Sequence, residues 1–210
     1  MLKIFSMFKS KQVNKEFCFV GNRPMSRTLE EMQLVNKKEA DLAFLQYKKE
    51  IIDTLLFDNG FLKYKTRAYV RINRIGLLEY IDLQKERYGS KTFCVNFSVI
   101  PLYCDCKCIN SSIDYRLGMY ISGKDVWWDY GSEVIAKGSM KNVSIAIEAF
   151  VLPWFEKVST VEGYKAELLK ICSAERAEKW IDAMENIGNE ELIQQSIEKL
   201  ELPSKIQRYT

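Results

Sequence analysis

The sequence predicts an α+β protein, with an antiparallel sheet of about four strands packed against helices and a C-terminal helical segment. Two observations predict this class. Residues 60–103 form three stretches of alternating apolar and polar side chains joined by short turns, as antiparallel strands do. Residues 39–57 instead repeat apolar side chains every three or four positions, and helical patterns dominate after residue 142. A chain of 210 residues is long enough to bury one sizeable core.

The chain divides into three predicted parts. Residues 1–38 form an N-terminal extension, residues 39–158 form the α+β domain, and residues 159–210 form C-terminal helices that pack on the same domain. Within the extension we expect a helix to begin after Ser26 or Thr28, because Glu31 stands three residues beyond Thr28 in the spacing of a capping box.

The helix over residues 39–57 is predicted to cover the apolar face of the sheet. The sequence Asp58-Asn59-Gly60 follows it and is typical of the end of a helix. The predicted apolar stripe of this helix consists of Leu42, Leu45, Ile52, Leu55 and Leu56.

The three predicted strands lie within residues 62–99. If they pair in sequence order, their polar side chains share one face and their apolar side chains pack against the helix. Hydrogen-bonding groups gathered on one face destabilise the fold unless they form hydrogen bonds with each other, with water or with a ligand. The predicted polar face contains Arg67 and Arg71 from the first strand, Asp82 and Gln84 from the second, and Asn96 and Ser98 from the third.

The remaining elements are predicted with less regular patterns. A fourth strand and an adjoining segment are expected first, and helices follow, one of them interrupted by Pro153. The predicted ranges are Arg116–Ile121 and Asp125–Tyr130 for the strand and segment, and Val143–Lys157, Gly163–Cys172, Ser173–Ile187 and Asn189–Leu200 for the helices.

The composition excludes several kinds of chemistry. The chain has no histidine, so Ser-His-Asp and Cys-His catalysis and every metal site that needs histidine are absent. Cys104, Cys106 and Cys108 alternate in a spacing that is unusual for zinc, with no fourth ligand, so we expect no metal. No glycine-rich phosphate loop or nucleophile elbow is present, which favours a protein that is not an enzyme and binds no cofactor.

The same sequence predicts a cytoplasmic location. We find no secretory signal before the six cysteines, which favours reduced thiols. No stretch approaches the roughly 20 apolar residues of a membrane-spanning helix.

A series of short motifs extends from about Leu42 to Phe155, and the most specific of them is the run Gln-Lys-x-Arg-Tyr-Gly at residues 84–89. Together they give a resemblance to domain-of-unknown-function family 4304. It implies the α+β domain but no reaction and no catalytic residues, since the family has none assigned. The matching positions are Gly60-Phe61, Lys63, Arg71, Gly76, Ile81–Lys85, Arg87–Gly89, Phe93, Val95-Asn96, Arg116, Trp127-Trp128 and Leu152–Trp154.

These observations give one set of candidate partner-binding residues. Polar groups on the sheet face, the turn after the second strand and the tryptophan pair are the kinds of groups that contact a partner. The alternative for the sheet face is a solvated surface whose charges pair with each other, and for the tryptophans a role in packing. The candidates are Arg67, Arg71, Asp82, Gln84, Lys85, Arg87, Tyr88, Asn96, Arg116, Trp127 and Trp128.

Three functions compete at this point. The first is recognition of a protein partner, for example a toxin bound by an immunity or antitoxin-like protein. The second is binding of single-stranded nucleic acid by a basic and aromatic sheet face. The third is an enzyme that uses Asp82 and Arg71 with Cys94 or Tyr80, which would need a base with a shifted pKa. The nucleic-acid face would consist of Lys63, Lys65, Arg67 and Arg71 with Phe61 and Tyr69 as stacking residues.

Overall fold

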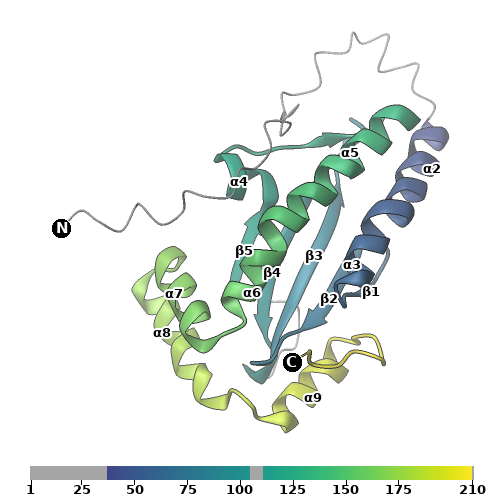
Figure 1. The fold of residues 1–210 in the computed structure, drawn as a ribbon. Helices are drawn as coiled ribbons and strands as arrows, with labels where there is room; N and C mark the ends of the chain where they lie inside the picture. Colours follow the sequence, from purple (N-terminus) through teal and green to yellow (C-terminus); the bar gives the residue numbers. More distant parts are fainter. Residues whose placement is uncertain (1–36, 105–110, 210) are drawn as a thin grey trace.

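A computed structural model describes residues 37–104 and 111–209 of the chain. The predicted helix start after Ser26 or Thr28 lies outside these residues, as do Cys106 and Cys108 of the cysteine cluster. The described part confirms the α+β class, because one antiparallel sheet packs against several helices, including C-terminal ones (Figure 1).

Six strands of the described residues form this sheet, rather than the four expected. Five of them lie in the order β1-β2-β3-β4-β5, and the short β6 pairs with the beginning of β4. Every pair is antiparallel, as the short connections predicted. The strands are β1 (Leu62–Tyr64), β2 (Ala68–Ile72), β3 (Leu77–Lys85), β4 (Thr92–Pro101), β5 (Ile113–Arg116) and β6 (Trp128–Asp129).

The predicted fourth strand at Arg116–Ile121 is wrong in its position. Strand β5 ends at Arg116, and the chain turns there into the short helix α4 (Leu117–Ser122). The turn requires glycine at position 118, because a Cβ atom there would lie only 2.6 Å from the backbone nitrogen of Val126. The chain after α4 therefore folds back over the end of β5.

Two long helices lie side by side across one face of the sheet (Figure 1). Each of them contains a π-helical segment between two α-helical parts. The second begins ten residues earlier than predicted, because the Ser132 side chain accepts a hydrogen bond from the Ile135 N–H and caps it. The first comprises α2 (Lys37–Tyr47), a π segment (Lys48–Asp53) and α3 (Thr54–Asp58); the second comprises α5 (Glu133–Ala146), a π segment (Ile147–Val151) and α6 (Leu152–Val158).

Pro153, which was predicted to kink or interrupt the second helix, lies just after a break in its α-helical pattern and does not end it. It occupies the first turn of α6, directly after the π segment. A π segment already disrupts the regular hydrogen-bond ladder, so the missing N–H of proline costs little at this point.

The predicted stripe of the first helix is also wrong in part. Leu42 is 57% exposed and Leu45 is 45% exposed, whereas Phe44 and Tyr47 are buried. The two aromatic side chains bury more apolar area than the leucines, so they determine which side of α2 faces the sheet. The π segment then carries the buried side onward to Ile52 and Leu56, which were predicted correctly.

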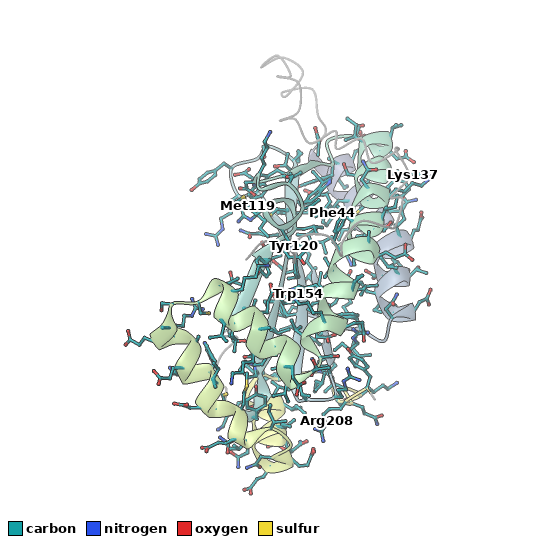
Figure 2. The ribbon with its side chains drawn as sticks, turned by 60° about the vertical axis from the view of Figure 1, so that its left-hand side comes forward. Phe44, Met119, Tyr120, Lys137, Trp154 and Arg208 are labelled. Carbon is teal, nitrogen blue, oxygen red and sulfur yellow. The ribbon has the colours of Figure 1, made fainter. Side chains whose placement is uncertain are left out.

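The core lies between the sheet and these two helices. Phe97 of β4 packs against Trp154 of α6, with ring centroids 5.1 Å apart, and against Tyr120 of α4 at 5.3 Å. Phe44 contacts Phe93 at 5.2 Å farther along the same strand. Figure 2 shows Phe44, Tyr120 and Trp154 along the middle of the molecule. The residues of β4 that point toward the helices are therefore Phe93, Val95, Phe97 and Val99.

The C-terminal helices lie at one end of the sheet (Figure 1). Asn189 and Ser173 cap helices there, as predicted. The Tyr64 hydroxyl of β1 donates to the Leu200 carbonyl, and the Ser196 hydroxyl donates to the Leu102 carbonyl. The end of the chain thus covers part of the sheet. The helices are α7 (Val161–Ile171), α8 (Ala174–Asp182), a 3-10 turn (Ala183–Asn186) and α9 (Glu190–Lys199).

Candidate functional site

Polar side chains from three adjacent strands gather on the side of the sheet that faces away from the two long helices. Since Phe93 and Phe97 point toward those helices, the residues that alternate with them point away. The register places Asp82 opposite Asn96 and Asn96 opposite Arg116, while Gln84 lies opposite Cys94. We define the open face as Asp82, Gln84, Cys94, Asn96, Asp114 and Arg116, with Asp125 and Trp127 beside Arg116. Of these side chains Cys94 is fully buried, Asp114 and Asp125 are exposed, and the others are partly buried.

The middle of the open face is a small hydrogen-bonded group. Asn96 Nδ2 donates to Gln84 Oε1 at 3.0 Å. The Cys94 thiol lies 3.8 Å from Gln84 Oε1 and 4.0 Å from Asn96 Oδ1. Burial raises the pKa of this thiol to about 11, so it is protonated at neutral pH and is a poor nucleophile.

A second group lies at the edge, where the chain folds back after α4. Arg116 Nη1 donates to Asp125 Oδ2 at 2.6 Å, and Trp127 Nε1 donates to the same oxygen at 3.0 Å. The guanidinium carbon of Arg116 is 5.2 Å from the centre of the Trp127 ring. Burial alone would raise the pKa of Asp125, but the two hydrogen bonds outweigh it and lower the pKa. The side chains of Arg116 and Trp127 are therefore held in place, although both are only partly buried.

Five of the eleven predicted residues meet on the open face, namely Asp82, Gln84, Asn96, Arg116 and Trp127. Asp114 and Asp125, which complete it, were not predicted. Their positions depend on the pairing of β5 and on the loop after α4. An isolated aspartate in the sequence predicts neither the pairing nor the loop. Trp128 points the other way and packs near Phe93, as one of the two tryptophans was expected to do.

The prediction that Arg71 shares the polar face with Asp82 is wrong. Arg71 lies opposite Glu79 in the register, and both side chains point toward the long helices. Arg71 is 8% exposed and Glu79 is 0% exposed, with Nε of Arg71 2.7 Å from Oε2 of Glu79. The predicted polar face is therefore divided between the two sides of the sheet.

The remaining candidates lie around the β3–β4 hairpin. Lys85 points toward the helix side, where its Nζ lies 2.8 Å from Asp41 Oδ1. Arg87 and Tyr88 are in the turn of the hairpin, where Tyr88 is 97% exposed. Arg67 is half-buried just before β2, and its charge acts on Asp82.

The residues predicted to bind nucleic acid do not all lie on one exposed face, since Lys63 and Lys65 are exposed but the two aromatic residues are not. Phe61 is 1% exposed and Tyr69 is 0% exposed, so neither ring is free to stack on a base. Arg71 is buried with them, and its guanidinium carbon lies 4.6 Å from the Phe61 ring centre. The aromatic part of that expected face is wrong, because these rings belong to the core.

Tyr209, near the end of the chain, completes the buried group around Arg71. Its backbone N–H donates to the Ile72 carbonyl at 3.0 Å, and its hydroxyl donates to Glu79 Oε1 at 3.0 Å. The guanidinium carbon of Arg71 is 4.0 Å from the Tyr209 ring centre. No sequence pattern predicted this contact, which joins residues separated by more than half of the chain.

The buried carboxyl of Glu79 is expected to make the stability of the fold depend on pH. Burial raises its pKa to about 7 in the folded chain, although the charge and hydrogen bonds of Arg71 and a hydrogen bond from Tyr209 oppose the rise. The ordinary value is 4.5, so between these values the folded chain binds a proton that the unfolded chain has released. This contribution to stability is present at the acidic end of the range and is lost as the pH rises.

We therefore expect Glu79 to make the free energy of unfolding fall between about pH 4.5 and about pH 7. Urea denaturation across this range measures the slope in wild type and in Glu79→Gln. The variant lacks the titrating carboxyl, so its slope is expected to be less negative. Equal slopes in the two proteins would contradict the assignment.

Two further properties concern the described residues only. Within residues 37–104 and 111–209, no helix is both long and apolar enough to cross a membrane. The same residues contain no cluster of three or more Cys, Asp or Glu side chains placed to hold a metal ion.

The fold and the open face define a class: an α+β protein whose antiparallel sheet carries two long helices on one side and, on the other, a group of polar side chains on β3, β4 and β5. A family model described as "Domain of unknown function (DUF4304)" matches residues 52–157, half of the chain. The chain belongs to this family, and the resemblance drawn from its motifs is confirmed. No curated protein and no solved structure matches it.

Proposed function

We propose that this chain is a non-enzymatic binding protein that recognises a protein partner through the open face. The observation that carries the proposal is the group of Arg116, Asp125 and Trp127 at the edge of that face. A partly buried tryptophan held by a hydrogen bond, with an arginine beside its ring, has the composition of a binding hot spot. Because both side chains are already fixed, little conformational entropy is lost when a partner contacts them.

The β3–β4 hairpin extends the same surface. Gln84 is the last partly exposed side chain of the open face before the turn, and Tyr88 projects from the turn with 97% of its surface exposed. Glu86 holds the turn, since its carboxylate accepts hydrogen bonds from the Tyr88 N–H and the Ser90 N–H. An exposed tyrosine on a fixed turn supplies a large contact area to a partner.

The setting that we propose is the cytoplasm, with the chain acting as an immunity or antitoxin-like partner of a toxin. The free thiols of Cys94 and Cys172 suit a reducing compartment. An immunity protein needs only a complementary surface, and the protonated Cys94 thiol on the open face argues against thiolate chemistry there.

The test begins with the partner. The full chain is purified from its native cell, and proteins that purify with it are identified by mass spectrometry. We expect Trp127→Ala and Arg116→Ala each to weaken the complex by about 2 kcal/mol, or roughly 30-fold in Kd, measured by calorimetry with the purified partner. Tyr88→Ala tests the hairpin in the same way.

Arg176→Ala is the matched control, because Arg176 is exposed on α8, outside the open face. Its complex should have the wild-type Kd. Recovery of the chain only as a free monomer, or full affinity in all three open-face and hairpin variants, would contradict the proposal.

A further inference from the structure

The connection between α3 and β1 contains the dipeptide Asn59-Gly60, in which asparagine is followed directly by glycine. None of the other asparagines in the sequence precedes a glycine. Because glycine has no Cβ atom, its backbone nitrogen can approach the preceding side chain more closely than the nitrogen of a larger residue can. Asn59 is partly buried and Gly60 is exposed, so water reaches both residues.

These two residues can react with each other and with water alone. The Gly60 nitrogen gives its proton to hydroxide and forms a bond to Cγ of Asn59. The bond from Cγ to Nδ2 breaks, and the departing nitrogen takes a proton from water and leaves as ammonia. Water then opens the resulting succinimide ring at one of its two carbonyl groups, which leaves aspartate or isoaspartate at position 59.

The guanidinium of Arg71 favours the first step of this reaction. Its Nη1 donates to the Asn59 carbonyl oxygen at 2.8 Å. This carbonyl and the Gly60 nitrogen belong to one peptide group, so the negative charge that forms when the nitrogen loses its proton is shared with the oxygen. A charged hydrogen-bond donor fixed at that oxygen stabilises the negative charge.

Two hydrogen bonds at the end of α3 must open before the ring can close. The Gly60 N–H donates to the Phe57 carbonyl at 3.0 Å, and Nδ2 of Asn59 donates to the Leu55 carbonyl at 2.8 Å. Hydrogen bonds at a helix end open more readily than those in its middle. Opening of this one turn is therefore sufficient, and the rest of the chain stays folded during the reaction.

We propose that Asn59-Gly60 is a site of spontaneous modification, at which the folded chain converts to aspartate or isoaspartate and thereby weakens the end of α3. This inference is independent of the proposed function. A carboxylate cannot donate to the Leu55 carbonyl, and it adds negative charge beside Asp58 at the C-terminal end of the helix, where the helix dipole disfavours it. Isoaspartate also adds one carbon atom to the backbone and so displaces the carbonyl that Arg71 binds.

The first experiment follows the modification in the folded protein. The full chain is incubated in mildly alkaline buffer well below its melting temperature, and peptide mapping by mass spectrometry detects the exchange of amide for carboxyl as a gain of about 1 Da. Asn59 should convert at least about ten-fold faster than Asn142 and Asn189, which are exposed but precede larger residues. Conversion of Asn59 no faster than these two would overturn the inference, even if the chain unfolded in urea reacts there.

Two variants complete the test. Asn59→Gln is the matched control, because its longer side chain would have to close a larger ring, and the gain in mass at this position should disappear. The modified wild-type chain carries one more negative charge and is separated by ion exchange. It should melt at a lower temperature than the unmodified chain, and Asn59→Asp should reproduce the part of this decrease that the aspartate product causes. Equal melting temperatures for the modified and unmodified chains would overturn the proposed weakening of α3.

Discussion

Replacing Arg71 with alanine should lower the free energy of unfolding by about 3–5 kcal/mol, which is the usual cost of removing one partner of a buried ion pair. The guanidinium of Arg71 is bound on several sides. It pairs with Glu79 at 2.7 Å, donates to the Asn59 carbonyl at 2.8 Å and stacks on Tyr209 at 4.0 Å. Alanine would leave the fully buried Glu79 carboxylate without a counter-ion and would release the end of the chain.

Urea denaturation of wild type and Arg71→Ala measures this loss. Arg176→Ala, which changes an exposed arginine, should remain within about 0.5 kcal/mol of wild type. The loss should be greater at about pH 8 than at about pH 5, because the Glu79 carboxyl is protonated at the lower pH. A loss below about 1 kcal/mol at the higher pH would contradict a buried ion pair.

The placement of Arg71 shows where the reasoning from sequence failed. The alternation of β2 was recognised, but its polar side was assigned to the solvent. In the structure the opposite side, which includes Val70 and Ile72, is also fully buried. The C-terminal part of the chain covers this part of the sheet, and the Tyr64 hydroxyl donates a hydrogen bond to the Leu200 carbonyl there. A strand covered on both sides gives no simple signal for which side faces outward.

The strands β3 and β4 were predicted more accurately. Asp82 and Gln84 share a face with Asn96 as expected, because these strands form a long hairpin whose register follows from a short turn. The α+β class followed from the same local patterns. Contacts within one hairpin are encoded nearby in the sequence, whereas the contacts of Tyr209 and Leu200 are not.

The edge of the open face was predicted only as separate residues. Arg116 and Trp127 were selected from motifs, but the strand expected after Arg116 would have carried them apart. Helix α4 instead reverses the chain within a few residues, and Asp125 joins the two side chains. Such a turn depends on tertiary packing, here of Gly118 against Val126, and the helical and strand patterns do not contain it.

Phe97→Ala is the other substitution with a large expected effect, a loss of about 3–5 kcal/mol in the free energy of unfolding. Phe97 is fully buried, and its ring lies within 5.6 Å of the Tyr115 ring as well as next to Trp154. The cavity would lie between the sheet and α6, where these large rings cannot close it without moving. Phe57→Ala is the control, since Phe57 is 47% exposed and should lose much less.

The same substitution tests how the core supports the open face. Phe97 and Asn96 are adjacent in β4 and point to opposite sides, so loosening the strand on one side also loosens it on the other. We expect the Asn96 side-chain amide signal of Phe97→Ala to shift or broaden under native conditions, and Phe97→Leu to cause a smaller change. A stability loss below about 1 kcal/mol, measured by urea denaturation, would show that the ring is not packed as described. An unchanged Asn96 signal in a strongly destabilised variant would show that the open face keeps its geometry independently of the core beneath it.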